Sequence, residues 1–369
     1  MKIHCSKADL SRGVQTIQSA LSARTTLPIL LNFLVETENS KLKLVSTDLE
    51  MGVKHYIPAE IETDGSITIP AKKFSDIIHT LQDEHDIDLT VEPGGKVHLK
   101  SGRSRFSIIG APKSEYPVLP EFNQAGSFTV DAPALEEMIR KTLIAASSDE
   151  SRHVLNGTFW VAHDGNLEMV ATDGRRLAVI KRTCLPKGKE FRVIVPTKIL
   201  AELLRLLSQE KASAEDKVQV AVTENQIAFQ FKTTTLLSRL VEGSFPNYEQ
   251  VVPIKRDIQV QLDTKAFWGI TKRASLCASD RGGSVRYTLR TGALHVYASS
   301  PNLEFDDELP VDYKGEEFAI AFNPQFILEG VKTFDCETIT MSLTAPVNPA
   351  LFEPIEGPEY KYVVMPMRV

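Results

Sequence analysis

The chain repeats itself at a spacing of about 125 residues, and this repeat limits the folds that are open to it. The segment Leu167 to Ile180 reads LEMVATDGRRLAVI, two apolar runs separated by Asp-Gly, and a related segment, LKLVSTDLEMGV, begins at Leu42. Asp48 of the first copy thereby matches Asp173 of the second. A third, weaker copy, LHVYASSPNLEF, follows in the last third of the chain. A recurring offset of this kind indicates repeated structural units, so we predict three of them.

Each unit is long enough to bury a core of its own. The 369 residues divide into units of about 123, and 42% of the residues are hydrophobic while 24% are charged. This composition is typical of globular domains rather than of disordered or fibrous chains. Two turn-rich junctions, EYPVLPEF at 115–122 and FPNYEQVVP at 245–253, mark the linkers. We therefore expect domains at residues 1–122, 123–253 and 254–369.

Every unit repeats one order of elements twice: a strand, a helix and three strands. Apolar residues recur at helical spacing in six segments, 6–21, 71–82, 133–145, 197–208, 264–276 and 324–333. Between them, short runs separated by Asp-Gly and similar turns predict roughly two dozen strands. This pattern predicts an α+β fold in which helices cover one side of each sheet.

The sequence contains no signal for a membrane or for secretion. No apolar run approaches the ~18 residues of a spanning helix, and the first ten residues lack the apolar core of a secretory signal. The four cysteines are too scattered for a zinc cluster and too few for a disulfide scaffold: Cys5, Cys184, Cys277 and Cys336. We expect a soluble cytoplasmic protein with reduced, buried thiols.

Charge is distributed unevenly between the expected helices and the rest of the chain. The net charge of −6 argues against a conventional nucleic-acid-binding protein. The six expected helices nevertheless carry an excess of six positive charges, so the remaining residues are strongly acidic. Solvated helix faces rich in Lys and Arg would produce this pattern, and so would a basic surface built from helices. Because the trend repeats, the first explanation is weakened.

No set of residues points to catalysis. The eight histidines show no HExxH or other metal-binding spacing, and neither GxGxxG nor GxSxG occurs. The segment Glu92 to Val97 contains Gly-Lys but lacks the Ser or Thr of a phosphate loop, so it is better explained as a hairpin turn. Asp173 could act as an acid or base, although Asp-Gly between strands more often shapes a turn. We expect no catalytic residue, metal or cofactor. A small-molecule site at a domain interface and a static protein-binding scaffold remain alternatives.

Seven short motifs resemble one family in the same order along the chain. They are RTTLPIL from Arg24, STDLEM from Ser46, SGRSRFS from Ser101, LNG from Leu155, ATDGRRLAV from Ala171, FPNY from Phe245 and YVVMPMRV from Tyr362. Together they resemble the bacterial DNA sliding clamps, the beta subunits of DNA polymerase III. The resemblance implies three domains of the DNA-clamp type and a non-catalytic processivity factor. It also implies a head-to-tail homodimer, closed into a ring with helices lining the hole.

The resemblance also implies a surface that faces duplex DNA without reading bases. It assigns this surface to Arg24, Lys72, Lys73, Arg152, Lys198 and Arg205. Other basic residues of the expected helices could face the duplex as well: Lys7, Arg12, Arg140, Lys141, Lys265, Lys272 and Arg273. The family often has aromatic residues where this chain has His153 and Val154, so stacking on DNA is not expected there.

A further implication of the resemblance is a hydrophobic pocket for short peptide motifs. Its ligands would be motifs of the replicative polymerase, the clamp loader, other polymerases and repair proteins. Its residues would be Leu155, Thr172, Gly174, Arg175, Arg176, Leu177, Pro246, Val251, Val347, Val363, Val364, Met365, Pro366, Met367 and Arg368. The chain departs from the family at Arg175, commonly His, at Gln250, where an Arg is found, and in the bulkier segment 348–358. Taken alone, the Met-Pro-Met segment would be interpreted as a core-packing terminus.

The ring interface implied by the resemblance joins an edge strand of the first domain to the third domain. Its first side would consist of Arg103, Arg105, Phe106 and Ile108, and its second side of Leu276, Glu304, Asp306, Asp307 and Glu308. Opposite charges would then flank an apolar centre. Because the two sides differ, the contact is heterologous and must close by rotation. An edge strand protected by charge explains Arg103 and Arg105 equally well when they are taken alone.

Overall fold

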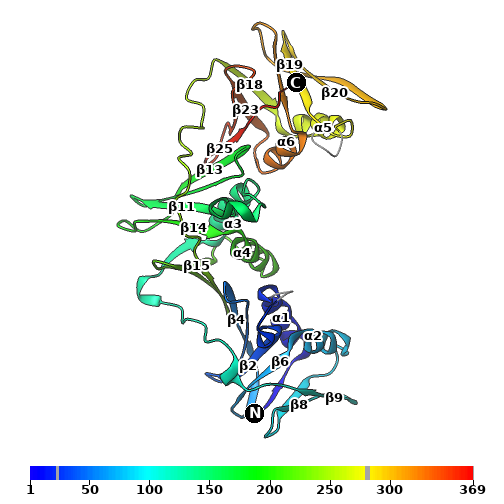
Figure 1. Ribbon diagram of the computed structural model, residues 1–369, viewed down its shortest axis with the longest axis vertical. Coiled ribbons are helices and arrows are strands. Elements are labelled where there is room, and N and C mark those ends of the chain that lie inside the picture. The colour runs from blue at the N-terminus through cyan, green and yellow to red at the C-terminus, as the bar shows by residue number, and fades with distance from the viewer. Residues whose placement is uncertain (22–24, 279–282, 369) are drawn as a thin grey trace. The chain divides into compact units, whose positions relative to one another are not determined.

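The computed structural model describes residues 1–21, 25–278 and 283–368 (Figure 1). These residues form two compact units. Unit 1 consists of Met1–Ala132 and Ala201–Leu240, and unit 2 of Pro133–Leu200 and Val241–Val369. The segment 123–253, which we expected to be the central domain, therefore contributes to both units. Arg24, assigned above to the DNA-facing surface, lies outside the described residues.

Unit 1 is built from two antiparallel sheets. Its strands are β1 (Lys2–Cys5), β2 (Asn32–Glu38), β3 (Lys41–Thr47), β4 (Met51–Pro58), β5 (Glu60–Thr63), β6 (Ser66–Pro70), β7 (Ile87–Val91), β8 (Lys96–Ser101), β9 (Ser104–Ile109), β10 (Phe128–Asp131), β15 (Lys217–Val222), β16 (Gln226–Phe231) and β17 (Thr234–Arg239). An eight-stranded sheet has the order β10-β15-β16-β17-β4-β3-β2-β6, and a five-stranded sheet the order β5-β1-β7-β8-β9. Because β17 pairs with β4, strands distant in sequence share one sheet.

Unit 2 repeats this arrangement with two further antiparallel sheets. Its strands are β11 (Gly157–His163), β12 (Asn166–Thr172), β13 (Arg176–Thr183), β14 (Phe191–Pro196), β18 (Ile258–Asp263), β19 (Val285–Arg290), β20 (Ala293–Ser300), β21 (Leu303–Pro310), β22 (Phe318–Phe322), β23 (Thr338–Leu343), β24 (Ala350–Pro354) and β25 (Glu359–Val364). The eight-stranded sheet has the order β14-β11-β12-β13-β25-β24-β23-β18, and the four-stranded sheet the order β21-β20-β19-β22. Here β13 and β25 make the long-range pairing.

Six α-helices lie in the described residues, at the six predicted places. They are α1 (Lys7–Ile17), α2 (Ala71–Thr80), α3 (Ala132–Leu143), α4 (Thr197–Gln209), α5 (Thr264–Ala274) and α6 (Pro324–Val331). Short 3-10 turns are η1 (Gln18–Ala20), η2 (Pro28–Leu31), η3 (Lys113–Glu115), η4 (Gln124–Gly126) and η5 (Glu150–Leu155). The α+β prediction is confirmed. None of the described helices is long and apolar enough to cross a membrane.

Sequence-encoded caps and apolar stripes explain where the helices begin and what they bury. Ser6 caps α1 by accepting a hydrogen bond from Asp9 N at 3.0 Å. The apolar face of α1 is fully buried, as its spacing predicted. In unit 1, α1 and α2 pack on each other and on β2, β3, β4 and β6; in unit 2, α5 and α6 pack on each other, and α6 packs on β25. Gly330 permits the last contact, because a Cβ there would lie 2.0 Å from Tyr362 Cε1.

The two copies of the hairpin turn share the same hydrogen bonds. Leu49 N donates to Thr47 Oγ1, and Gly174 N donates to Thr172 Oγ1, each at 3.0 Å. Each threonine hydroxyl donates to the carbonyl four residues ahead, at 2.8 and 2.6 Å. The residue after the aspartate has a positive φ in both copies, +78° at Leu49 and +83° at Gly174. The repeat seen in the sequence therefore extends to individual hydrogen bonds.

All four cysteines are free thiols. Cys5 and Cys277 are buried, as predicted, whereas Cys184 and Cys336 are partly exposed. The prediction of burial was therefore wrong for the second pair, because both residues lie in connections outside the helices and strands. Burial raises the pKa of the Cys5 thiol to about 12, so this thiol stays protonated at neutral pH.

A buried histidine joins β4 to β17 within unit 1. His55 Nδ1 lies 2.8 Å from Thr234 Oγ1, and the His55 side chain is 4% exposed. Burial lowers the pKa of His55 to about 4; Glu210 and Asp9 oppose this shift, and Arg12 adds to it. The neutral imidazole is therefore the form that the folded unit accommodates.

We expect unit 1 to lose stability as the pH falls below 6.5. The pKa of His55 is about 6.5 in the unfolded chain and about 4 in the folded chain, so the unfolded chain binds the proton first. The contribution is complete above pH 6.5, has fallen by about 2 kcal/mol at pH 5, and is lost as the pH passes 4. Urea unfolding at pH 7.5 and 5.0 measures this fall. His55→Gln should remove it, whereas His79→Gln, at an exposed position of the same unit, should not. An equal fall in His55→Gln and the parent would contradict the prediction.

Candidate functional site

The turn between β12 and β13 is held in one conformation by its own aspartate. Asp173 Oδ1 accepts hydrogen bonds from Arg175 N at 2.9 Å and from Arg176 N at 3.0 Å, and Asp173 Oδ2 accepts from Arg176 Nε at 3.1 Å. Arg152 Nη1 donates to the Asp173 carbonyl at 3.2 Å. Asp173 therefore shapes the turn, as its Asp-Gly pattern favoured. Arg152, predicted to face DNA, is partly engaged by the same turn.

Arg176 links this turn to α6. Besides Asp173 it pairs with Glu329 on α6, and its guanidinium carbon lies 4.6 Å from the centre of the Phe326 ring. The Arg176 side chain is only 10% exposed. An ion pair and a cation–π contact together fix a long side chain that would otherwise be mobile. The first residue of β13 is thus fixed to α6.

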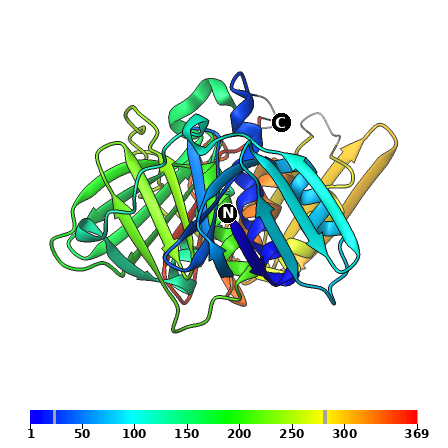
Figure 2. The ribbon, with the colours of Figure 1, turned by 90° about the horizontal axis from the view of Figure 1, so that it is seen from below.

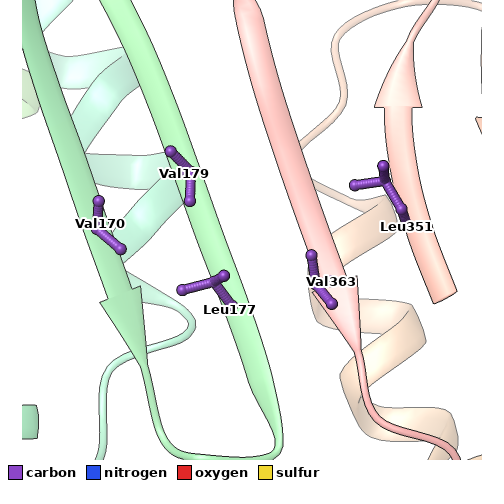
Figure 3. Close-up of a cluster of buried hydrophobic side chains, with 5 residues drawn as sticks. All are labelled: Val170, Leu177, Val179, Leu351 and Val363. Atoms are coloured by element: carbon purple, nitrogen blue, oxygen red, sulfur yellow. The ribbon is translucent and has the colours of Figure 1, made fainter. Parts of the chain in front are cut away.

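An apolar cluster lies on one face of the eight-stranded sheet of unit 2 (Figure 3). Its five buried members come from four neighbouring strands: Val170, Leu177, Val179, Leu351 and Val363. Phe159, Phe245, Tyr248 and Val252 pack against them, and the Phe159 and Phe245 rings stack with centroids 5.1 Å apart. The second predicted linker therefore lies on this cluster. Leu351 shows that part of the bulk in segment 348–358 enters the core.

The end of the chain lies next to the turn. Pairing of β13 with β25 places Leu177 directly opposite Val363. Beyond β25, Met365 N donates to Arg175 O at 2.8 Å, and Met367 N donates to a carbonyl of β22, also at 2.8 Å. Two backbone hydrogen bonds thus anchor the terminal segment on either side. Met365 is still 39% exposed, so the segment also offers apolar surface to a ligand.

A hollow of about 700 Å³ opens beside this terminal segment. It is lined by Arg286, Ala319, Ile320, Ala321, Pro346, Val347, Met365, Pro366, Met367 and Arg368. Its size is in the range of sites that bind small molecules or short peptides. Two methionines in its wall give it a flexible, polarizable lining that adapts to different ligands.

The sequence-predicted pocket residues occupy three neighbouring parts of unit 2. Those in or beside the paired strands are Thr172, Gly174, Arg175, Arg176, Leu177, Val363 and Val364, and those lining the hollow are Val347, Met365, Pro366, Met367 and Arg368. Pro246 and Val251 belong to the linker, and Leu155 ends η5; none of these three lines the hollow. Sequence reasoning missed its remaining lining residues, which come from β19, β22 and the loop before Val347.

The basic residues assigned to DNA differ in how far they are already neutralised. Intramolecular ion pairs engage Lys7 with Asp83, Arg140 and Lys141 with Asp335, Arg205 with Glu202 and Arg273 with Asp307. By contrast, Lys72 and Lys73 are exposed at the start of α2, and Lys265 and Lys272 are exposed on α5. No ion pair engages these four lysines within the described ranges. Lys198 is exposed on α4. These four lysines, together with Arg12, which is exposed on α1 and likewise has no ion pair among the described residues, therefore offer the most available charge to a polyanion.

Strand β9 is the outer strand of the five-stranded sheet, beside β8 (Figure 2). Arg103, in the turn before β9, and Arg105 are exposed, and Phe106 is half-buried. Ile108, however, is 7% exposed and packs into its own core, whereas Ile109 is 68% exposed. Strand alternation assigns the two neighbouring isoleucines to opposite faces. The sequence reasoning had not included Ile109 among the interface residues.

Strand β21 is the corresponding outer strand of the four-stranded sheet in unit 2. Two of its acidic residues are engaged within the chain, Asp306 with His295 at 2.9 Å and Asp307 with Arg273 at 2.9 Å. The Arg273 guanidinium holds the pKa of Asp307 below its usual range. Glu304 and Glu308 are exposed and have no ion-pair partner in the part of the chain that the structure describes. Two carboxylates thus remain available on this edge.

Comparisons with known proteins identify the family. Models of the N-terminal, central and C-terminal domains of the DNA polymerase III beta subunit match residues 1–120, 129–247 and 249–368. The beta sliding clamps of Haemophilus influenzae and Synechocystis sp. are each 32% identical to this chain, over 100% of both chains.

Solved structures agree with this match along the entire chain. The Pseudomonas aeruginosa sliding clamp bound to griselimycin is 31% identical with a TM-score of 0.94, over 100% of both chains. The Bacillus subtilis clamp is 27% identical with a TM-score of 0.95, over 100% of this chain and 99% of that one. The chain therefore belongs to the DNA polymerase III beta-subunit family, the bacterial sliding clamps, which are non-catalytic processivity factors of DNA replication.

Proposed function

We propose that two copies of this chain close head to tail into a ring that encircles duplex DNA and slides along it. The ring tethers the replicative polymerase, the clamp loader, other polymerases and repair proteins through the hollow beside the terminal segment. Each copy contributes three domains, at 1–122, 123–253 and 254–369, and the ring acts in the cytoplasm. Membership of the sliding-clamp family is the starting point for each of these steps.

The observation that carries the proposal is a pair of outer strands with opposite charge. β9 and the turn before it present Arg105 and Arg103, and β21 presents Glu304 and Glu308. An unpaired outer strand exposes backbone donors and acceptors to which another strand can add. Since the two strands differ, each chain supplies one of each kind, and two such contacts close a dimer by rotation. Opposite charges favour this pairing over the pairing of like strands.

Retention by a closed ring requires few strong contacts to DNA. A topologically linked protein cannot dissociate without opening, so its charges need only attract the phosphates weakly and without reading bases. The overall charge of −6 fits this role, because an acidic exterior limits nonspecific binding while exposed helix lysines face the duplex.

The decisive experiment compares circular with linear DNA. Parent protein loaded by its clamp loader onto nicked circular DNA should remain bound through gel filtration, and it should be lost once a nuclease linearises the circle. Equal retention on both forms would identify ordinary electrostatic binding and reject the ring. Repeating the gel filtration at higher salt separates the two mechanisms further, because only electrostatic binding depends steeply on salt.

We expect Lys72 and Lys73 to contribute more to DNA attraction than Arg205. Neutralising both lysines (Lys72→Gln with Lys73→Gln) should lower the slope of log affinity against log salt by about two, one for each lost phosphate contact. Arg205→Gln should change the slope by less than one, because Glu202 and Gln209 already engage its guanidinium. Anisotropy of a labelled short duplex at several salt concentrations measures the slopes. A larger effect of Arg205→Gln would contradict this order.

A further inference from the structure

One face of α5 combines positive charge with an exposed aromatic ring. Lys265, Trp268 and Lys272 follow one another at spacings of three and four residues, which aligns them in a row on the helix surface. Both lysines are exposed, and Trp268 is 36% exposed. The other tryptophan of the chain, Trp160, is completely buried. The row of three residues is called the Lys-Trp-Lys face below.

We propose that the Lys-Trp-Lys face binds single-stranded DNA, with the indole of Trp268 stacked on a base and the two lysines on neighbouring phosphates. A flat aromatic ring within a basic surface is the usual means of holding an unpaired strand without sequence preference. Duplex DNA cannot use the ring in this way, because each base face is already covered by the next base pair. The two lysines are about 10 Å apart along the helix axis, so the site spans a short stretch of strand.

The charges of this face are available for phosphates. α5 contains no acidic residue between Thr264 and Ala274, and no ion pair to Lys265 or Lys272 occurs among the residues that the structure describes. The neighbouring Arg273 differs, because it pairs with Asp307 at 2.9 Å. A phosphate can therefore bind either lysine without first displacing a carboxylate from it.

The helix surface at Gly269 is open. Gly269 follows Trp268 inside α5, where glycine weakens a helix relative to alanine. Apart from the backbone of the helix, a Cβ at this position would have a single described atom within 4 Å, Arg273 Nη1 at 3.7 Å. Packing inside the chain therefore does not require the glycine. Its effect is to leave the helix without a side chain at the position that follows Trp268.

The inference rests on the proposed function, because a ring on primed DNA meets an unpaired strand where the duplex ends. The first test titrates the parent with oligo(dT) and with a duplex of equal length while tryptophan emission is recorded. Oligo(dT) should quench the emission of Trp268, leaving that of buried Trp160 as an internal reference, and the duplex should not. Equal quenching by both DNAs would overturn the proposal.

The second test measures affinity for fluorescein-labelled oligo(dT) by anisotropy. Trp268→Leu should abolish the quenching and weaken binding about tenfold, whereas Trp268→Phe, which keeps an aromatic ring, should retain most of the affinity. Lys265→Gln and Lys272→Gln should each lower the salt slope by about 0.7. Lys187→Gln, the same charge change at an exposed loop position, is the matched control and should leave the slope unchanged.

Two further results would overturn the proposal. The first is unchanged binding of oligo(dT) by Trp268→Leu. The second is a Trp268→Leu protein whose only defect is loss of the dimer, which would assign Trp268 to the interface near Leu276. Retention on nicked circular DNA separates this site from the ring itself. Trp268→Leu should be retained like the parent. If the parent is not retained, the proposed ring is wrong. The oligo(dT) titrations test the Lys-Trp-Lys face independently of that result.

Discussion

Leu276→Asp should convert the dimer into a monomer of about 41.0 kDa. Leu276 is 70% exposed in the single chain, two residues after the end of α5, as expected for an apolar residue that a second chain covers. In the proposed interface it faces the apolar centre around Phe106. An aspartate there would be buried without a partner, at a cost of several kcal/mol. Light scattering at micromolar concentration distinguishes the monomer from a species of twice the mass.

A matched control separates this effect from a general effect of a new surface charge. Ile254, directly after the second linker, is 93% exposed and lies outside the expected interface, so Ile254→Asp should remain dimeric. The Leu276→Asp monomer should also fail to be retained on nicked circular DNA. A parent protein that is itself monomeric at micromolar concentration would contradict the ring.

Truncation after Val364 should abolish binding of a QLxLF-type peptide. The removed segment forms one wall of the hollow, with Met365 and Met367 as its largest apolar side chains. In the intact protein each buried apolar anchor contributes about 1.5–3 kcal/mol. The cost of ordering an extended peptide reduces the sum to roughly micromolar affinity. Without this wall the site loses the apolar contacts on which peptide binding depends. Calorimetry with the isolated peptide measures the loss.

The truncation must act on the pocket rather than on the fold or the ring. The truncated protein should keep its dimer, because the segment bonds to β22, which lies at the opposite edge of the four-stranded sheet from β21. Ile355→Ala, at a position 47% exposed in the segment that departs from the family, should bind the peptide like the parent. Unchanged peptide affinity after truncation would contradict the assignment of the site to this hollow.

The sequence alone predicted features that depend on short-range interactions. Helical spacing of apolar residues gave six helices, because an amphipathic period needs only neighbours three and four positions apart. Asp-Gly between apolar runs gave the hairpin turn at Asp173, because the aspartate bonds to backbone groups two and three residues ahead. The same local chemistry explains why the copy at Asp48 forms the same turn. Repetition of these signals was enough to predict repeated units and an α+β fold.

Only the tertiary structure decided which distant segments meet. Pairing of β4 with β17 and of β13 with β25 divides the segment 123–253 between two compact units, and no local pattern encodes that choice. The pairing also brings Leu177 opposite Val363, while β19 and β22 complete the hollow. The charge that a basic side chain can offer to a ligand also depends on its partners in the folded chain. Arg140 and Lys265 are equally basic in the sequence, yet Asp335, 195 residues further along the chain, engages the first, and no ion pair engages the second in the described part of the chain. Distances between side chains far apart along the backbone determine these properties, and those distances exist only in the folded chain.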